Sequence, residues 1–314
     1  MKVLCKTTGM IRLIKVMIAV SAIMLFSGCA SFQIAPEEPL SGGAASGAVS
    51  DDTPAGRKSP GDFSPFEEIS LDPSWDYADH AVISSGYAVL YRSSNDRKDA
   101  VIAVNAGHGT LGGEEKTVYC HPDRSPKVTN GSNPKGSYKA VAVAVGMIFS
   151  GGKTEAEVTL LVARKLRDRL LFAGYDVLMI RDSDDVQLDN VARTVIANNM
   201  SDCLVSIHFD GDGLNYDKGF FYIPVPDEIK EMEPVSGIWQ EHEKLGQSLV
   251  KGLKQQSCSR YDGRVDALEL TQTCYATVPA VVVELGNARS DISDEALQKY
   301  ADGLAAGIEE YMKK

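Results

Sequence analysis

Short runs of apolar, β-branched residues alternate with amphipathic helical patterns from about residue 99 onward. The strand-like runs over 100–105, 203–208 and 280–284 are nearly all apolar. Continuous apolar strands are typical of a sheet buried on both faces, and their alternation with helices is typical of βαβ units. The sequence therefore predicts a three-layer α/β fold, in which helices cover both faces of a largely parallel, twisted sheet.

Thr154 and Glu157 have the spacing of a capping box, and apolar residues follow at helical intervals. Gly174 is a suitable stop for this helix. A strand over 86–92 is expected to lead into the edge of the domain. The remaining expected elements are a strand over 175–180, helices over 188–199 and 239–256, and a closing helix over 293–312.

Residues 1–28 have the composition of a secretory leader. A basic start precedes an apolar run over 16–26, which is shorter than the ~20 residues of a spanning helix and has the length of a signal-peptide core. The small residues before Cys29 resemble a bacterial lipoprotein cleavage site. That resemblance implies export, lipid on Cys29 and anchoring to the cell-envelope membrane. An uncleaved N-terminal anchor is the alternative.

Residues 29–98 are predicted to form a lipid-anchored flexible tether that ends in the lead-in strand. The part from 30 to about 65 is rich in Pro, Gly, Ser and Ala, so it buries too little apolar surface to offset the entropy of ordering. Residues 99–314 form the predicted folded domain. The net charge of −11 argues against nucleic acid as a partner and leaves glycans, peptides and small molecules open.

The cysteines of the predicted domain match no CxxC zinc pattern. Cys203 lies in an apolar run and is expected in the core. A Cys258–Cys274 bridge is compatible with an oxidising compartment. His80 and His242 lie outside any motif, and His121 is expected in a solvated loop.

Three of the predicted buried strands end in a polar residue that can bind a metal or transfer a proton: His108, His208 and Glu284. The carboxyl ends of parallel strands meet at one edge of a sheet, so these side chains are expected to share one crevice. A single histidine at a strand end is more often a hydrogen-bonded structural residue than a ligand. The joint pattern, with adjacent glycines that permit tight turns, favours a chemical site. These glycines are Gly107, Gly109 and Gly286.

The same residues resemble the zinc-dependent N-acetylmuramoyl-L-alanine amidases of the cell-wall hydrolase type (amidase_3). The resemblance covers about 99–312, with its motifs in the family's order. The motifs are Val101-Ile-Ala-Val-Asn-Ala-Gly-His-Gly109, Thr154-Glu-Ala-Glu-Val-Thr-Leu160, Gly174-Tyr-Asp-Val-Leu-Met-Ile-Arg181, Arg193 with Ala197-Asn198, Ser206-Ile-His208 and Pro279-Ala-Val-Val-Val-Glu-Leu-Gly286.

The resemblance implies a zinc ion held by His108, Glu155 and His208, with an open fourth position for water. It also implies that Glu284 is the catalytic base. Glu157 is the rival for the carboxylate ligand. It lies two residues further along the helix, so its side chain points in a different direction, and the capping box already occupies it.

The implied function is that of a peptidoglycan hydrolase, which uses zinc-activated water to cleave the amide between N-acetylmuramic acid and L-alanine of the stem peptide. Its partners are then muropeptides and, through Cys29, a membrane. The sequence departs from the family at Asn105-Ala106, at 287–290 and in the long stretch between His108 and Glu155. Two alternatives are a zinc carboxypeptidase-like hydrolase of stem peptides and a non-catalytic cell-wall binding protein. The four intact site residues argue against the second.

Overall fold

The computed structural model describes residues 67–131 and 133–313. The predicted signal peptide, Cys29 and most of the predicted tether lie outside the described residues and remain predictions. Within the described part, no helix is both long and apolar enough to cross a membrane.

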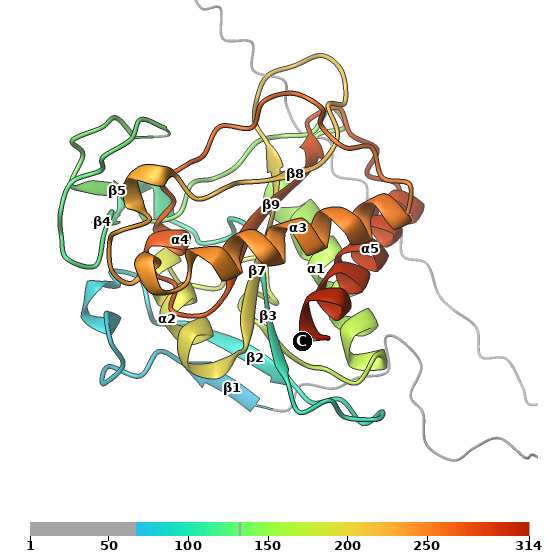
Figure 1. The fold of residues 1–314 in the computed structure, drawn as a ribbon, viewed down its shortest axis with the longest axis horizontal. Helices are drawn as coiled ribbons and strands as arrows, with labels where there is room; N and C mark the ends of the chain where they lie inside the picture. The colour runs from blue at the N-terminus through green and yellow to red at the C-terminus, as the bar shows by residue number, and fades with distance from the viewer. Residues whose placement is uncertain (1–66, 132, 314) are drawn as a thin grey trace, which may run out of the picture. The chain divides into compact units, whose positions relative to one another are not determined.

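The domain is built on a seven-stranded sheet with the order β1-β2-β6-β3-β7-β9-β8 (Figure 1). The four inner strands β6, β3, β7 and β9 run parallel, and the outer strands pair antiparallel. The predicted α/β fold with a largely parallel sheet is therefore confirmed. The strands are β1 (Glu67–Ser70), β2 (Tyr87–Tyr91), β3 (Val101–Ala106), β6 (Asp176–Met179), β7 (Cys203–Asp210), β8 (Phe221–Tyr222) and β9 (Ala280–Asn287).

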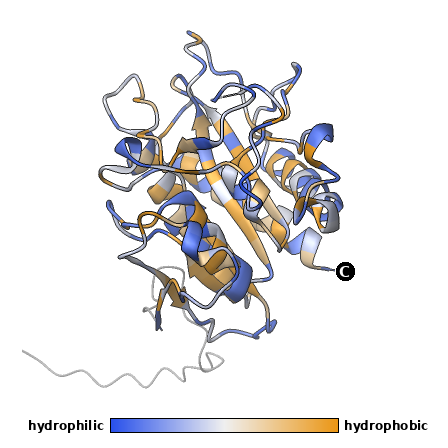
Figure 2. Cartoon of the chain, turned by 90° about the vertical axis from the view of Figure 1, so that its left-hand side faces the viewer, coloured by the Kyte–Doolittle hydropathy of each residue, from blue (hydrophilic) through white to orange (hydrophobic). Residues whose placement is uncertain are grey.

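Helices cover both faces of this sheet. Successive residues of a strand point to opposite faces, so Val205 and Ile207 of β7 join one apolar cluster while Leu204 joins another. The first cluster includes the helices α1 (Glu155–Phe172), α3 (Trp239–Gln255) and α5 (Asp294–Met312), and the opposite face carries α2 (Asn190–Met200) and α4 (Thr271–Tyr275). Figure 2 shows the apolar strands between the helical layers.

The long stretch between His108 and Glu155 contains a second, two-stranded sheet of β4 (Thr117–Tyr119) and β5 (Lys139–Val141). The remaining elements are short 3₁₀ helices: η1 (Ala78–His80), η2 (Gly113–Glu115), η3 (Asp227–Ile229) and η4 (Val235–Gly237). The sequence predicted none of these short elements, because they contain too few residues to show a hydrophobic period.

The expectation that His121 is solvated is wrong. Its side chain is buried, with Nε2 lying 2.5 Å from a carboxylate oxygen of Glu269 and Nδ1 lying 2.9 Å from the Ser125 hydroxyl. Glu269 is far from His121 in the sequence, so no local pattern predicts this pair. Cys258 and Cys274 are free thiols that pack in different apolar clusters, so the structure contains no bridge between them.

Candidate metal centre and active site

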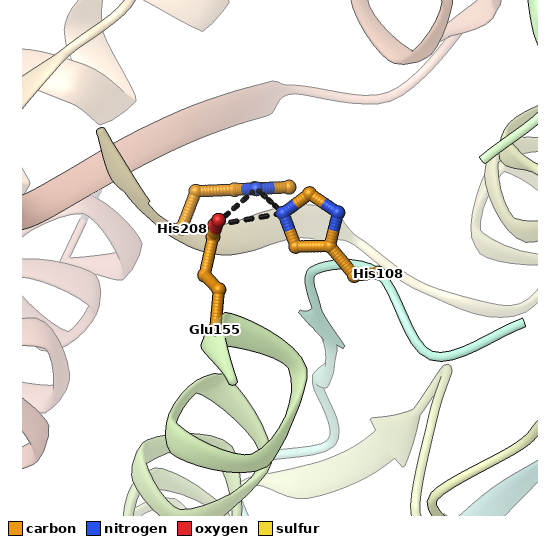
Figure 3. Close-up of side chains that lie close together, drawn as sticks. All are labelled: His108, Glu155 and His208. Atoms are coloured by element: carbon orange, nitrogen blue, oxygen red, sulfur yellow. Dashed lines mark hydrogen bonds and ion pairs between the residues drawn. The ribbon is translucent and has the colours of Figure 1, made fainter. Parts of the chain in front are cut away.

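Three donor atoms converge at the carboxyl edge of the sheet (Figure 3). His108 Nε2 lies 2.8 Å from Glu155 Oε1, and His208 Nδ1 lies 3.1 Å from that oxygen and 3.1 Å from His108 Nε2. In the described part of the chain, this is the one group of three or more His, Cys, Asp or Glu donors close enough to hold a metal ion. The structure thus brings together the three residues that the sequence singled out as ligands.

The donor set fits zinc. Ligand atoms bound at about 2.0–2.1 Å in a tetrahedron lie roughly 3.3 Å apart. The donor separations of 2.8 and 3.1 Å are slightly shorter, so a small outward movement of the side chains would admit the ion. Two imidazoles and one carboxylate are also the ligand types found in catalytic zinc sites.

Two close backbone approaches shape this site. A Cβ on Gly107 would lie 2.4 Å from the His208 ring, so only glycine lets the turn after β3 pass beside that imidazole. Gly146, with φ of 83°, lies against the other two donors. A Cβ there would lie 2.8 Å from His108 Cδ2 and 2.9 Å from Glu155 Oε2. No motif in the sequence distinguishes Gly146 from the other glycines.

The segment 144–147, called the strap below, holds His108 and Glu155 by backbone hydrogen bonds. His108 Nδ1–H donates to the Ala144 carbonyl over 2.7 Å, which leaves the Nε2 lone pair for a metal. The Met147 amide donates to Glu155 Oε2 over 3.0 Å, and the Phe209 amide donates to Oε1 over 3.0 Å. These partners fix the orientation of both side chains before any ion binds.

Two buried guanidinium groups support the turn that carries His108. Arg193 donates to the His108 carbonyl over 2.6 Å and also to Asn105 Oδ1, Ala106 O and Thr110 Oγ1. Arg181 donates to the carbonyls of Ala106 and Gly107. Both side chains are fully buried. They satisfy carbonyls that the irregular turn leaves outside the sheet, and buried carbonyls without partners are costly.

Glu155 is the first residue of α1, and the capping box predicted for this helix is present. The Glu157 amide donates to Thr154 Oγ1, and the Thr154 amide donates to Glu157 Oε2 over 2.7 Å. Glu157 is exposed and engaged in the cap, whereas Glu155 is buried against the histidines. Burial raises the pKa of Glu155, but its contacts with the imidazoles of His108 and His208 outweigh burial and hold the pKa of Glu155 well below its usual value. Burial lowers the pKa of His208, which favours the neutral, metal-binding imidazole.

Glu284 lies beside the donors on β9, where it is the Cα partner of His208. Glu284 as a residue is only half-buried, but its Oε2 is buried and has no hydrogen-bond partner among the described residues. Burial raises the pKa of Glu284 well above its usual value, and the charges of Glu155 and Asp210 raise it further. A carboxylate with a free, buried oxygen and a raised pKa is suited to accept a proton.

The Thr154 cap links helix stability to the position of Glu155. Replacing Thr154 with Ala is expected to lower the free energy of unfolding by about 1 kcal/mol and to weaken metal binding, because the helix start that carries Glu155 becomes less fixed. Chemical denaturation and zinc titration measure the two effects. Ser293→Ala removes the equivalent cap of α5, where the side chain accepts from the Ala296 amide. It should cost similar stability and leave zinc affinity unchanged. Equal zinc affinities for both variants and the native protein would contradict this prediction.

Comparison with known proteins agrees with this geometry. The family model described as N-acetylmuramoyl-L-alanine amidase matches residues 102–313. A search of curated proteins finds no match. Among solved structures, the apo N-acetylmuramyl-L-alanine amidase of Mycobacterium abscessus is 22% identical with a TM-score of 0.57, and the match covers 68% of this chain and 99% of that chain. The Mycobacterium smegmatis amidase is 20% identical with a TM-score of 0.56, covering 68% and 97%.

At these identities the solved structures establish the fold alone, while the family match extends over most of the chain and includes all four site residues. The chain belongs to the N-acetylmuramoyl-L-alanine amidase family and is a peptidoglycan amidase.

Proposed function

We propose that this protein is a zinc-dependent amidase that cleaves the bond between N-acetylmuramic acid and L-alanine of the stem peptide. The observation that supports this proposal best is the convergence of His108 Nε2, Glu155 Oε1 and His208 Nδ1. Glu284 is the strand neighbour of His208, and its buried Oε2 has no hydrogen-bond partner among the described residues. The three donors would hold Zn²⁺, and Glu284 would act as the base.

Each residue then has a defined task. Bound Zn²⁺ would supply Lewis-acid chemistry, which activates water as a nucleophile and polarises the scissile carbonyl. Glu284 Oε2, which has no hydrogen-bond partner among the described residues, would take the proton of the attacking water and later pass it to the leaving amine of L-alanine. The Ala144 carbonyl keeps His108 in the tautomer with a free Nε2.

Removing the metal is expected to abolish hydrolysis, and adding stoichiometric zinc should restore it. Purified muropeptides provide the readout, because only an amidase releases the intact stem peptide from the sugar. Mass analysis that showed a shortened peptide would favour the zinc carboxypeptidase instead. Zinc binding without any change in the muropeptides would support a non-catalytic cell-wall binding protein.

We also propose that the protein is an exported lipoprotein, with residues 1–28 removed, lipid on Cys29 and the residues between Cys29 and β1 connecting the lipid to the catalytic domain. The predicted tether of 29–98 is thereby shortened, because β1 and β2 already belong to the sheet of the domain. The basic start, the short apolar run and the small residues before Cys29 support this proposal. The mass of the mature N-terminal peptide tests it: an unmodified Cys29, or a chain that still begins at Met1, would contradict it.

A further inference from the structure

The edge of the sheet lies one strand away from Glu284, and the residue just before the edge strand, Phe220, bridges in parallel to Arg260. β8 is the last strand, and it pairs only with β9. Phe221 of β8 is the cross-strand partner of Glu284. Directly opposite residues in an antiparallel pair lie about 5 Å apart and project from the same face of the sheet. The ring of Phe221 is therefore beside the proposed catalytic base.

A pocket of about 240 Å³ lies along this edge strand. Its walls are aromatic and aliphatic, and its one charged wall residue is Arg260. The apolar wall residues are Phe221, Tyr222, Pro224, Val250, Tyr261 and Val265. The ammonium of Lys218 lies over the rings of Phe221 and Tyr261, at 4.6 and 4.9 Å from their centroids. Because Asp210 and Asp212 pair with Lys218, its charge is neutralised and it serves to hold both rings in place.

The backbone along this edge offers a pairing position. The Phe220 amide donates to the Ser259 carbonyl over 2.8 Å, and the Tyr261 amide donates to the Phe220 carbonyl over 3.0 Å. Alternate residues of a strand direct their amide and carbonyl groups to the same side. Tyr222, two residues after Phe220, therefore presents its backbone groups to the same edge, where no described residue outside the sheet bonds to them. An extended peptide can add to such an edge.

Arg260 brings a positive charge without a partner to the pocket. The residue is exposed, and across 67–131 and 133–313 no carboxylate lies within ion-pair distance of its guanidinium. The neighbouring Arg264 differs, because its Nε lies 3.3 Å from Asp266. An unpaired guanidinium at the edge of an apolar pocket is suited to bind a carboxylate through two parallel hydrogen bonds.

We propose that this pocket binds the stem peptide of the substrate beyond the scissile amide, with Arg260 pairing to one of its free carboxylates. This inference rests on the proposed function and specifies how its substrate is held. An extended peptide advances ~3.3 Å per residue. Phe221, whose backbone pairs with that of Glu284, forms one wall of the pocket, so the pocket receives residues of the peptide after the first. The apolar walls accept their methyl and methylene groups, and the Tyr222 backbone pairs with the peptide backbone.

The test compares two muramoyl-peptides that share the scissile bond, one with free stem-peptide carboxylates and one with these carboxylates amidated. Arg260→Gln is expected to raise KM for the free-carboxylate substrate by about tenfold or more and to change kcat little. On the amidated substrate, the variant and the native enzyme should have the same KM. Arg264→Gln is the matched control and should leave both KM values unchanged.

An Arg260→Gln variant with native KM, or with an equal loss on both substrates, would overturn the inference and leave the amidase proposal intact. If the native enzyme cleaves neither substrate, the proposed function fails. The inference about the pocket is then tested separately, by measuring binding of the free stem peptide. Calorimetry with Glu284→Gln and the free stem peptide should then show binding that weakens about tenfold or more when Arg260→Gln is added. Absent binding, or equal binding by both variants, would overturn the inference.

Discussion

Glu284→Gln is expected to lower kcat on muramoyl-peptides by about 10²- to 10⁴-fold while the protein keeps its zinc. The amide has the size of the carboxylate but cannot accept the proton of the attacking water. Glu284 is outside the group of three donor atoms, so the metal should remain. Steady-state kinetics with defined muropeptides and metal analysis of the same protein sample measure both quantities.

Glu157→Gln is the matched control for this variant. Glu157 is exposed and completes the cap of α1, a position that Gln also suits. It should therefore retain native kcat and native zinc content. A fully active Glu284→Gln protein would show that another group is the base, and loss of zinc in Glu157→Gln would revive Glu157 as the carboxylate ligand.

Glu284→Gln lowers kcat but should stabilise the metal-free fold. The raised pKa of Glu284 means that the folded, metal-free protein disfavours its charged form. The contribution of this group to stability is fully present below the unfolded pKa of about 4.5 and is lost as pH rises through the higher folded pKa. Metal-free Glu284→Gln should therefore unfold at a higher temperature than the metal-free native protein near pH 8. The difference should shrink toward pH 4.5, and a constant difference would contradict the assignment.

The parts of the fold with a strong hydrophobic period could be predicted from the sequence. The buried strands β3, β7 and β9 read as apolar runs, and α1 shows its capping box and its stop at Gly174, whose φ is 97°. Parallel strands end at one edge of a sheet, so the apolar runs also predicted that His108, His208 and Glu284 lie close together. Edge strand β1 was missed because only Ile69 of its four residues is buried.

The features that position the ligands could not be predicted, because they depend on contacts between distant segments. Gly146 of the strap lies in a long stretch without periodicity, and its role depends on the fold placing it against His108 and Glu155. In the sequence, Arg193 stood out only as part of a family motif. Its structural role, which is to support the turn that carries His108, follows from its hydrogen bond to a residue 85 positions away. The His121–Glu269 pair was missed for the same reason.

His208→Ala is expected to lower zinc affinity by more than about 100-fold. Losing only the hydrogen-bonding partner of a metal ligand already costs ~10- to 100-fold, and this variant loses a ligand itself. The variant removes one of the three donor atoms and leaves His108 Nε2 and Glu155 Oε1, which lie 2.8 Å apart in the native protein. Two donors cannot define a catalytic site that ordinarily uses three protein ligands. Activity should fall with zinc occupancy and should recover only partly at high zinc concentration.

His80→Ala is the control for this variant. His80 is also buried and hydrogen-bonded, with Nδ1 lying 3.0 Å from the Tyr275 hydroxyl, but it contributes nothing to the donor group. Its loss should destabilise the protein and leave zinc affinity at the native value, which separates loss of a ligand from general damage to the fold. Competition with a chromophoric chelator gives the affinities, and denaturation gives the stabilities. Undiminished zinc in His208→Ala would remove this residue from the ligand set, and the third protein ligand would then have to be another residue.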